Sequence, residues 1–597
     1  MTITKNIRNI IERFADNPAL LDSLVVTAFV RNLGLKVYSN FIASFIDDEA
    51  SELTMLQNLN SIEDLISIFE QAIPKADVVT NGAIYTPAYI REFIVDECIA
   101  RCEKLLVDCR CADIACGCGA FLMTLAERMR MHWPDKGFRD IYNHLWGIDI
   151  CAESIQRTKI VLSLRAAMDG EVIDEERLHL SVKNTLSPDA SSGFGLFDLV
   201  VGNPPYVRAK NIDNDSKCLL GRWEVSRCGN ADLYIPFFEI ALKHLETKGV
   251  MGFITPNSYF KSVNARLFRK YLSDHRLSPV IWNFGEEKIF KKKMVYTCIT
   301  VIENKPSDMI EYVRLSSIEI QHRSFSNFSQ IPIKSLDHHK GWNLNTSEVM
   351  ENIARIEAVG RPLGELFHIK NGIATLANDI FIFRPDGECG DYYLHNGVEI
   401  EKTVCRDIVK PNIIKNEEEL KAKREKIIFP YDRSMTLLDE DKLKVQYPKA
   451  YAYLLNNKPL LLLRDKGGGD YPWYAFGRTQ AIADVGKKLL FPYMTDSPHF
   501  VYTSEEEMLI YCGYAIYDDS EEDLQVLKRI LESPIFAYYI RHTSKPYSTG
   551  YYSYAKNYVK GFGVPFLDEQ EKRHLLALKN QYEITHFLNQ KYGLKIC

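Results

Sequence analysis

The sequence lacks the features that mark membrane and secreted proteins. Its 597 residues contain no run of eighteen apolar residues, and the start of the chain, Met1 to Asn6, carries no apolar signal core. Its 14 cysteines are sparse for so long a chain and do not suggest a disulfide framework. We therefore expect a cytoplasmic protein that has no membrane partner.

The chain also lacks an overall positive charge. Its formal net charge of −6 argues against a protein that is basic throughout and binds nucleic acid by charge alone. The charges are unevenly placed, because residues 207–300 hold 16 Lys and Arg against 9 Asp and Glu. A basic face there could meet phosphates, and a solvated helix surface would have the same composition.

The densest group of cysteines lacks the spacing of a zinc site. Six cysteines lie between Cys98 and Cys118, but none of them forms the C-x2-C pair of a zinc ligand set. Two of the six also fall inside a glycine-rich turn. We expect buried thiols and no metal site.

The most informative motif is the segment Leu-Val-Val-Gly-Asn-Pro-Pro-Tyr-Val that begins at Leu199. Phe197 to Val201 predicts a short buried strand, which the prolines end because they have no N–H to give to a sheet. Asn203 then offers an amide oxygen, Pro204 a backbone carbonyl and Tyr206 a flat ring. Two acceptors beside a ring suit the exocyclic amine of a heterocycle, although the motif alone is equally typical of an ordinary turn.

From residue 105 onward, predicted strands and helices alternate. Alternating units of this length predict an α/β domain with a doubly wound, mostly parallel sheet and helices on both faces. Ligands bind such a sheet at the carboxyl ends of its strands. The predicted strands are 105–113, 145–150, 178–182, 197–201, 250–255, 280–284 and 295–302, and the helices include 120–131, 154–167 and 231–245.

Polar side chains follow these predicted strands. Asp113 opens the turn Asp-Ile-Ala-Cys-Gly-Cys-Gly, whose Gly117 and Gly119 allow the backbone to approach a ligand closely. Asp149 is placed to accept both hydroxyls of a ribose, and Asn184 can read an adenine edge. Because the turn is not a phosphate-cradling G-x-G-x-x-G, the pattern favours S-adenosylmethionine over NAD or ATP.

The first part of the chain is predicted to be helical. Residues 1 to about 75 show helical periodicity, and residues 1–80 hold 6 Lys and Arg against 11 Asp and Glu. We expect a helical cap or lid rather than a DNA-clamping arm, and no nuclease activity. Downstream, Thr86 and Pro87 are a good N-cap and first helical residue for an amphipathic helix.

In their order and spacing these motifs resemble the gamma class of DNA adenine-N6 methyltransferases, type II restriction-modification methylases with a TaqI-like layout. The resemblance covers about residues 80–305 with specific motifs. It implies the seven-stranded, doubly wound fold of S-adenosylmethionine-dependent methyltransferases. It also implies a helical N-terminal region at 1–78, a catalytic domain at 79–308 and an α+β target-recognition (DNA specificity) domain at 309–597.

The resemblance implies a role for each motif residue. The implied cofactor-binding residues are Tyr85, Thr86, Pro87, Asp113, Ala115, Cys116, Gly117, Gly119, Asp149, Ile150, Asn184 and Thr185. The implied catalytic residues are Asn203, Pro204, Pro205, Tyr206 and Phe290, where the two aromatic rings pack on a flipped base. The expected DNA-binding residues are Arg208, Lys293, Lys545, Tyr547 and Tyr551.

The sequence departs from the family pattern at three places. Ile114 stands where the family has proline, and Cys118 stands where serine is common. Neither change removes a needed group, because the backbone makes those contacts. Asn184 replaces a more usual acid, so the adenine contact rests on an amide.

The implied activity is transfer of a methyl group from S-adenosylmethionine to a flipped-out adenine in double-stranded DNA. Such a protein would be a monomer associated with the bacterial nucleoid, and it would protect host DNA from a cognate restriction endonuclease encoded separately. Two alternatives stay open: methylation of RNA or of a protein glutamine amide, and a modification subunit that needs a separate specificity subunit. Cytosine-C5 chemistry is excluded, since the loop has no Pro-Cys nucleophile.

Overall fold

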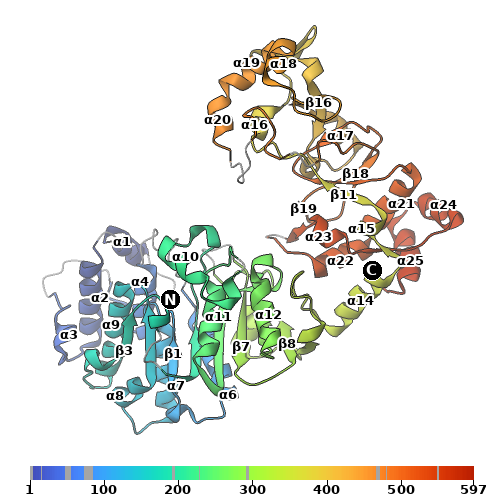
Figure 1. The fold of residues 1–597 in the computed structure, drawn as a ribbon. Coiled ribbons are helices and arrows are strands. Elements are labelled where there is room, and N and C mark those ends of the chain that lie inside the picture. The colour runs from blue at the N-terminus through green and yellow to red at the C-terminus, as the bar shows by residue number, and fades with distance from the viewer. Residues whose placement is uncertain are drawn as a thin grey trace. The chain divides into compact units, whose positions relative to one another are not determined.

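The computed structural model divides the chain into two compact units, Met1–Ser347 and Glu348–Cys597 (Figure 1). Each unit has its own hydrophobic core. Within the described ranges, no helix has both the length and the apolar character needed to cross a bilayer. The structure describes residues 5–14, 17–47, 56–72, 85–190, 195–227, 229–290, 295–464, 471–478, 481–547 and 550–596.

The first unit is built on one nine-stranded sheet, with the strand order β3-β2-β1-β4-β5-β7-β6-β8-β9. All neighbouring pairs from β3 to β5 are parallel, whereas β7 runs antiparallel to β5 and β6. The predicted α/β class with a mostly parallel sheet is confirmed. The strands are β1 (Cys111–Asp113), β2 (Leu145–Asp149), β3 (His179–Val182), β4 (Phe197–Gly202), β5 (Leu245–Pro256), β6 (Val280–Asn283), β7 (Thr297–Glu303), β8 (Met309–Arg314) and β9 (Ser329–Pro332).

Two details of the predicted sheet were wrong. The sheet has nine strands and not seven, because β8 pairs in parallel with β6 and β9 adds to β8. Without β8, the backbone of β6 would form an exposed sheet edge. The sheet therefore continues past residue 308, where the sequence places the end of the catalytic domain. The strand predicted at 105–113 is confined to β1, since Leu106–Asp108 forms a 3₁₀ turn.

The winding of the sheet places a ligand-binding crevice beside β1. The chain passes from β1 through α7 to β2 and through α9 to β3, and it builds the other half from β4 through α11 to β5. Right-handed crossovers then put the two sets of helices on opposite faces. The winding reverses between β1 and β4, and ligands bind outside the carboxyl ends of such a pair. The main helices are α6 (Ala88–Arg101), α7 (Ala120–His132), α8 (Phe138–Ile141), α9 (Ala152–Met168), α10 (Asn214–Leu220), α11 (Tyr234–Lys243), α12 (Arg266–Asp274) and α13 (Ser317–His322).

The N-terminal region is helical, as predicted. Its helices are α1 (Lys5–Arg13), α2 (Pro18–Leu33), α3 (Asn40–Ala43) and α4 (Ile62–Gln71). A buried ion pair ties α2 to α9, with Arg157 Nε 2.9 Å from Asp22 Oδ1. The same guanidinium donates to the Phe69 carbonyl of α4 at 3.2 Å. These helices are therefore fixed to the helix that follows β2.

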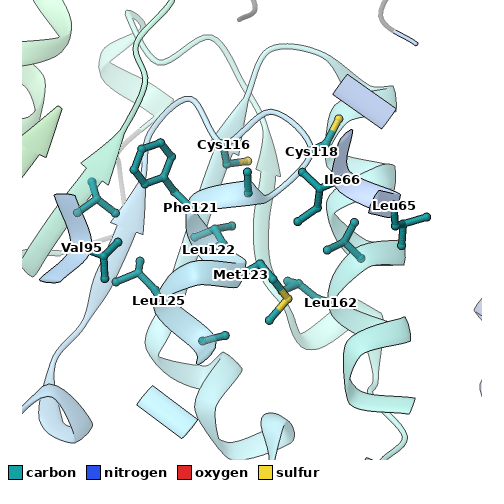
Figure 2. Close-up of a cluster of buried hydrophobic side chains, with 14 of the residues drawn as sticks. Leu65, Ile66, Val95, Cys116, Cys118, Phe121, Leu122, Met123, Leu125 and Leu162 are labelled. Atoms are coloured by element: carbon teal, nitrogen blue, oxygen red, sulfur yellow. The ribbon is translucent and has the colours of Figure 1, made fainter. Parts of the chain in front are cut away.

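Apolar side chains join α4 to the glycine turn before α7. Leu65 and Ile66 of α4 belong to the same buried cluster as Cys116, Cys118 and Phe121 (Figure 2). The prediction of buried thiols is confirmed for five of the six grouped cysteines, and Cys102 is half-buried. The N-terminal helices thus share their core with the turn expected to bind a cofactor.

The second unit combines small sheets with helices, as an α+β domain does. Its larger sheets have the strand orders β11-β22-β18-β20 and β12-β17-β16-β21. The helices are α14 (Ser347–Ala358), α15 (Leu363–Leu366), α16 (Asn378–Phe381), α17 (Glu417–Ala422), α18 (Glu440–Gln446), α19 (Pro448–Asn456), α20 (Lys458–Leu462), α21 (Glu521–Leu531), α22 (Pro534–Thr543), α23 (Lys556–Val559), α24 (Glu569–Ala577) and α25 (Gln581–Tyr592). The strands are β10 (Arg361–Pro362), β11 (His368–Asn371), β12 (Ile382–Phe383), β13 (Gly387–Cys389), β14 (Tyr392–His395), β15 (Val398–Glu401), β16 (Cys405–Val409), β17 (Glu425–Ile428), β18 (Lys488–Phe491), β19 (Met494–Thr495), β20 (Val501–Thr503), β21 (Leu509–Ile510), β22 (Tyr514–Tyr517), β23 (Tyr552–Ser553) and β24 (Gly563–Val564).

Asp22→Ala should destabilise the first unit. The substitution leaves Arg157 as an uncompensated buried charge, and removing one partner of a buried pair costs about 3–5 kcal/mol. In denaturant unfolding, we expect the first unit of the variant to unfold at a lower denaturant concentration than that of wild type. The control is Asp274→Ala, which breaks the exposed pair of Asp274 with Lys270 and should cost under about 1 kcal/mol. Equal losses in the two variants would contradict the structural role of the buried pair.

Candidate active site

The turn after β1 is shaped by its acid and its two glycines. Asp113 is buried, and its Oδ1 accepts from the Ala115 N–H at 3.0 Å. Gly117 and Gly119 both have positive φ, at 53° and 84°. A Cβ on Gly119 would lie 2.9 Å from Thr158 Cγ2, whereas one on Gly117 would meet nothing within 4 Å. Gly119 therefore permits helix packing, and Gly117 lies where a ligand can approach the backbone.

The end of β2 is bonded to this turn. Asp149 Oδ2 accepts from the Gly117 N–H at 2.9 Å, and its Oδ1 accepts from the Cys151 N–H at 2.9 Å. The Thr185 hydroxyl, beyond β3, donates to the Ile114 carbonyl at 2.7 Å. These contacts bring together three strand ends that the sequence predicted to line one site.

Asn184 is oriented by its neighbours. Its Nδ2 donates to Ser216 Oγ of α10 at 3.1 Å, and its Oδ1 accepts from the Leu186 N–H at 3.0 Å. The amide is therefore fixed between the end of β3 and the first turn of α10. The motif gave no sign of this support from α10.

The loop after β4 lies directly beside the first turn. A Cβ on Gly202 would be 2.6 Å from Asp113 Oδ1, so only glycine allows this approach. One residue later, Asn203 Nδ2 donates to Thr86 Oγ1 at 3.0 Å. The amide nitrogen is thus the end that faces Thr86. The prediction that Thr86 caps the following helix was wrong, because Pro87 occupies the N-cap position of α6 without a side-chain cap.

The aromatic residues of the loop form an edge-to-face cluster. Tyr206 donates its hydroxyl to the Ile254 carbonyl at 3.0 Å, and burial raises its pKa well above the ordinary value. Its ring centroid lies 6.0 Å from that of Phe290, at an interplanar angle of 74°. The sequence correctly paired these two rings. They contact one another here and do not form a parallel slot.

One pocket connects these elements. Among its described lining residues, four carry carboxyl groups, and none is Lys, Arg or His. The lining residues are Glu70, Tyr85, Thr86, Asp113, Ile114, Ala115, Cys116, Gly117, Cys118, Ala120, Phe121, Asp149, Ile150, Cys151, Ser154, Asn184, Thr185, Leu186, Asn203, Pro205, Asp213, Ser216, Leu233 and Phe237. The predicted residues Pro87, Gly119, Pro204, Tyr206 and Phe290 are not in this lining. The described lining therefore holds acidic side chains and no basic ones, and it includes Asn203 of the loop after β4.

Burial makes these carboxyl groups hard to ionise. Burial, with a smaller contribution from the neighbouring Asp149, outweighs the opposing Ala115 hydrogen bond and raises the pKa of Asp113 to about 8. Burial likewise raises the pKa of Glu70 to about 8 and raises that of Asp149. A pocket with this charge pattern favours a cationic ligand over a phosphate-bearing one.

Sequence reasoning missed Glu70, which reaches the pocket from α4. A signal was present, because Glu70 lies four residues after Ile66 and so continues the buried stripe of the helix. Nearby, Glu63 of the same helix accepts from Tyr85 Oη at 2.9 Å and from Arg91 Nη2 at 2.5 Å. Arg91 also bonds to the Thr86 carbonyl. The N-terminal helix thus holds the Tyr-Thr-Pro segment in place.

The expected DNA-binding residues lie in three places. Arg208 is exposed just after the loop, and Lys293 lies outside the described residues. In the second unit, Lys545 Nζ lies 5.5 Å from the Tyr547 ring centroid, and the Tyr547 N–H donates to the Tyr551 carbonyl at 2.7 Å. Tyr493, which the sequence did not single out, joins them through a 2.9 Å contact between its hydroxyl and that of Tyr547.

Asp113→Asn should stabilise the unliganded chain at alkaline pH relative to wild type. A carboxyl whose pKa is higher in the folded chain binds more protons when folded, so its stabilising effect is complete below pH 4 and is lost as the pH rises toward 8. Asparagine keeps the acceptor for Ala115 and does not titrate. Between pH 5 and pH 8, the free energy of unfolding of the variant should rise relative to that of wild type by at least about 1 kcal/mol. Thermal or denaturant unfolding measures this difference. Parallel pH profiles would show that Asp113 ionises freely.

Comparisons with known proteins agree with this geometry. Residues 143–290 match the family model Eco57I restriction-modification methylase. The type II restriction enzyme and methyltransferase RM.Eco57I of Escherichia coli is 23% identical over 527 residues, covering 76% of this chain and 52% of that protein. The type II methyltransferase M.BstVI of Geobacillus stearothermophilus is 22% identical, and the match covers 77% of this chain and 85% of that protein.

The fold is also found among solved structures. The type IIL restriction-modification enzyme MmeI, solved in complex with DNA, aligns over 100% of this chain and 91% of its own with a TM-score of 0.62 and 13% sequence identity. The chain spans about half the length of RM.Eco57I, the first of the curated relatives. The resemblance predicted from the sequence is confirmed: this chain is similar to the type II restriction-modification methyltransferases.

Proposed function

We propose that the chain is a DNA adenine-N6 methyltransferase that uses S-adenosylmethionine. The observation that carries the proposal is the position of Asn203, whose side chain stands at one end of a pocket lined by carboxyl groups and a glycine turn. An amide that grips an exocyclic amine and a pocket for a cationic nucleoside are the two halves of an N-methyl transfer site. The names of the curated relatives support methyl transfer, and the DNA complex of MmeI supports a DNA substrate.

The pocket fits S-adenosylmethionine by its charge. This cofactor carries a sulfonium, an ammonium and a carboxylate group, so its net charge is positive, and it has no phosphate. The described lining offers carboxyl groups and no cationic side chain. Thr86, Asp113, Ala115 and Gly117 would hold its methionine part. Asp149 would hold the ribose, and Asn184 the adenine. When bound, the cofactor supplies an electrophilic methyl group, as it does in related enzymes.

The chain's own groups activate and orient the amine. The Thr86 contact turns Asn203 Nδ2 away and presents Oδ1 as the acceptor. Together with the Pro204 carbonyl, it would accept both amine hydrogens and favour the pyramidal nitrogen that attacks in line. No His or Lys lies in the described lining, and none is required, because the amine can lose its proton to water after transfer.

The target base must leave the duplex to reach this loop. Flipping costs about a few kcal/mol and is offset by stacking in the pocket. Tyr206 would provide one stacking face. Phe290 contacts Tyr206 edge to face, so it must rotate to pack on an inserted base.

The second unit would recognise the DNA sequence. Lys545, Tyr547 and Tyr551 form a contiguous group with Tyr493, and such side chains contact phosphates and base edges. We propose that the chain acts as a monomer on double-stranded DNA in a restriction-modification system. The cognate endonuclease would be a separate protein, as in systems that contain a dedicated methyltransferase.

Asn203→Ala should abolish methyl transfer. The purified chain is incubated with duplex DNA and S-adenosylmethionine labelled in its methyl group, and the DNA is digested to nucleosides. Wild type should yield N6-methyladenine, and the variant should lose about 10²–10³-fold in rate, as expected for removing one group that acts in the transition state. Label in RNA or protein instead of DNA, or an unaffected variant, would contradict the proposal.

Lys545→Ala should weaken DNA binding without changing the preferred sequence. The plot of log K against log salt has a negative slope, and the loss of one phosphate contact makes that slope less negative by about 0.9. Binding is measured by fluorescence anisotropy with duplexes of several sequences at several salt concentrations. The control is Lys572→Ala, because Lys572 is already paired with Asp523 at 2.9 Å. An unchanged salt slope in Lys545→Ala would remove this residue from the interface.

A further inference from the structure

The N-terminal helix α4 places an acid in the cofactor pocket. Glu70 lines the pocket, and its Oε2 is buried with no hydrogen-bond partner. A buried carboxylate oxygen without a donor costs free energy unless a ligand satisfies it. Nothing in the Asn-Pro-Pro-Tyr motif or the glycine turn requires an acid at this position.

The groups that surround Glu70 are committed elsewhere. Arg91 of α6 is paired with Glu63 and bonds to the Thr86 carbonyl. Tyr85 donates its hydroxyl to Glu63. From the glycine turn, Cys118 contributes a buried thiol whose pKa burial raises well above its ordinary value. Glu70 therefore lines the pocket with its Oε2 buried and without a hydrogen-bond donor from these groups.

We propose that Glu70 binds the α-ammonium group of the methionine part of the cofactor. The proposal rests on the proposed function, because it deepens the same site. Tyr85, Thr86 and the glycine turn surround Glu70 in the lining, whereas Asp149 has its carboxylate bonded to Gly117 and Cys151 at the end of β2. Asp113 Oδ1 accepts from the Ala115 N–H, and neither oxygen of Asp113 is among the buried atoms of the described residues that lack a partner. Glu70 is the acid whose oxygen still needs a donor, and a primary ammonium has three.

The assignment gives the N-terminal helices a function. The contacts of Glu63 with Arg91 and Tyr85 fix α4 to α6 and the segment before it. The contacts of Arg157 with Asp22 and Phe69 fix α2 and α4 to α9. Glu70 then adds an acid from α4 to the pocket that the motif residues line. The helical region that precedes the methyltransferase motifs is thus part of the cofactor site.

Protonation supports the same assignment. Burial outweighs the opposing charge of Arg91 and, with a smaller contribution from Glu63, raises the pKa of Glu70 to about 8. At pH 7 the empty pocket therefore holds Glu70 mostly as the neutral acid. An ammonium beside it lowers its pKa, so binding at pH 7 releases a proton and becomes tighter as the pH rises from 6 to 8.

The test compares two ligands on two proteins. Glu70→Gln removes the charge at nearly constant volume. S-adenosylhomocysteine carries the α-ammonium, and its analogue with hydrogen in place of the amino group does not. Isothermal titration calorimetry on the full chain should show S-adenosylhomocysteine bound about tenfold or more weakly by Glu70→Gln, since a charge-assisted hydrogen bond is lost. The deaminated analogue should bind both proteins equally, within about twofold.

A control variant and a second measurement distinguish the role of Glu70 from a general effect on the helix. Asp64→Asn changes an acid on the same helix whose Oδ2 accepts from Ser61 at 2.7 Å and which does not line the pocket. It should leave both affinities unchanged. Calorimetry at pH 7 in buffers of different ionisation enthalpy should show that wild type releases more protons than Glu70→Gln on binding S-adenosylhomocysteine. The thermal midpoint of unliganded Glu70→Gln should not fall below that of wild type.

The outcomes separate this inference from the proposed function. The role of Glu70 is refuted if Glu70→Gln binds S-adenosylhomocysteine as tightly as wild type does, or if it loses affinity for both ligands equally. The methyltransferase proposal would then still stand. If wild type binds neither S-adenosylmethionine nor S-adenosylhomocysteine, the proposed function itself fails.

Discussion

The constraint on which this site depends is the burial of several carboxyl groups in one pocket without a cationic side chain among its described lining. Asp113, Asp149 and Glu70 come from β1, β2 and α4, and burial raises the pKa of each. An unliganded protein with this arrangement gives up stability at neutral and alkaline pH. A positively charged ligand restores this stability, whereas a nucleotide that carries phosphate would lower it further. The lining of this pocket therefore favours a cationic ligand over one that carries phosphate.

The second feature is the closeness of the two chemical halves. Gly202 allows the end of β4 to press against Asp113, and Asn203 is hydrogen-bonded to Thr86. The residues proposed to hold the cofactor and those proposed to grip the amine are thus in direct contact across the reversal point of the sheet. Because the hydrogen bond from Asn203 to Thr86 orients the amide, a substitution at Thr86 should affect both the proposed cofactor site and the proposed site for the target amine.

Much of this arrangement could be predicted from the sequence. Alternating apolar runs located β2, β4 and β5, and the polar residues after them pointed to one edge of the sheet. The period of these patterns is local, so it is visible without the fold. Asp113, Asp149 and Asn203 were found because each ends a predicted strand.

Other features depended on contacts between distant segments. Glu70 lies 133 positions before Asn203 in the chain, and its spacing from Ile66 indicates a buried position without showing which pocket that position faces. The strands β8 and β9 were missed because pairing with β6, rather than local alternation, makes them part of the sheet. The N-cap at Pro87 was misassigned to Thr86 since the sequence does not show that Asn203 engages the threonine hydroxyl.

The most direct test of the account is a crystal structure of the chain with sinefungin, whose amine stands in place of the transferred methyl group. The account predicts the ribose beside Asp149, the methionine part beside Thr86 and Glu70, and the amine facing Asn203 Oδ1, with room for a target nitrogen about 3–3.5 Å from it. A ligand bound in the reverse direction, or away from this pocket, would contradict the central claim that one pocket joins cofactor and target amine.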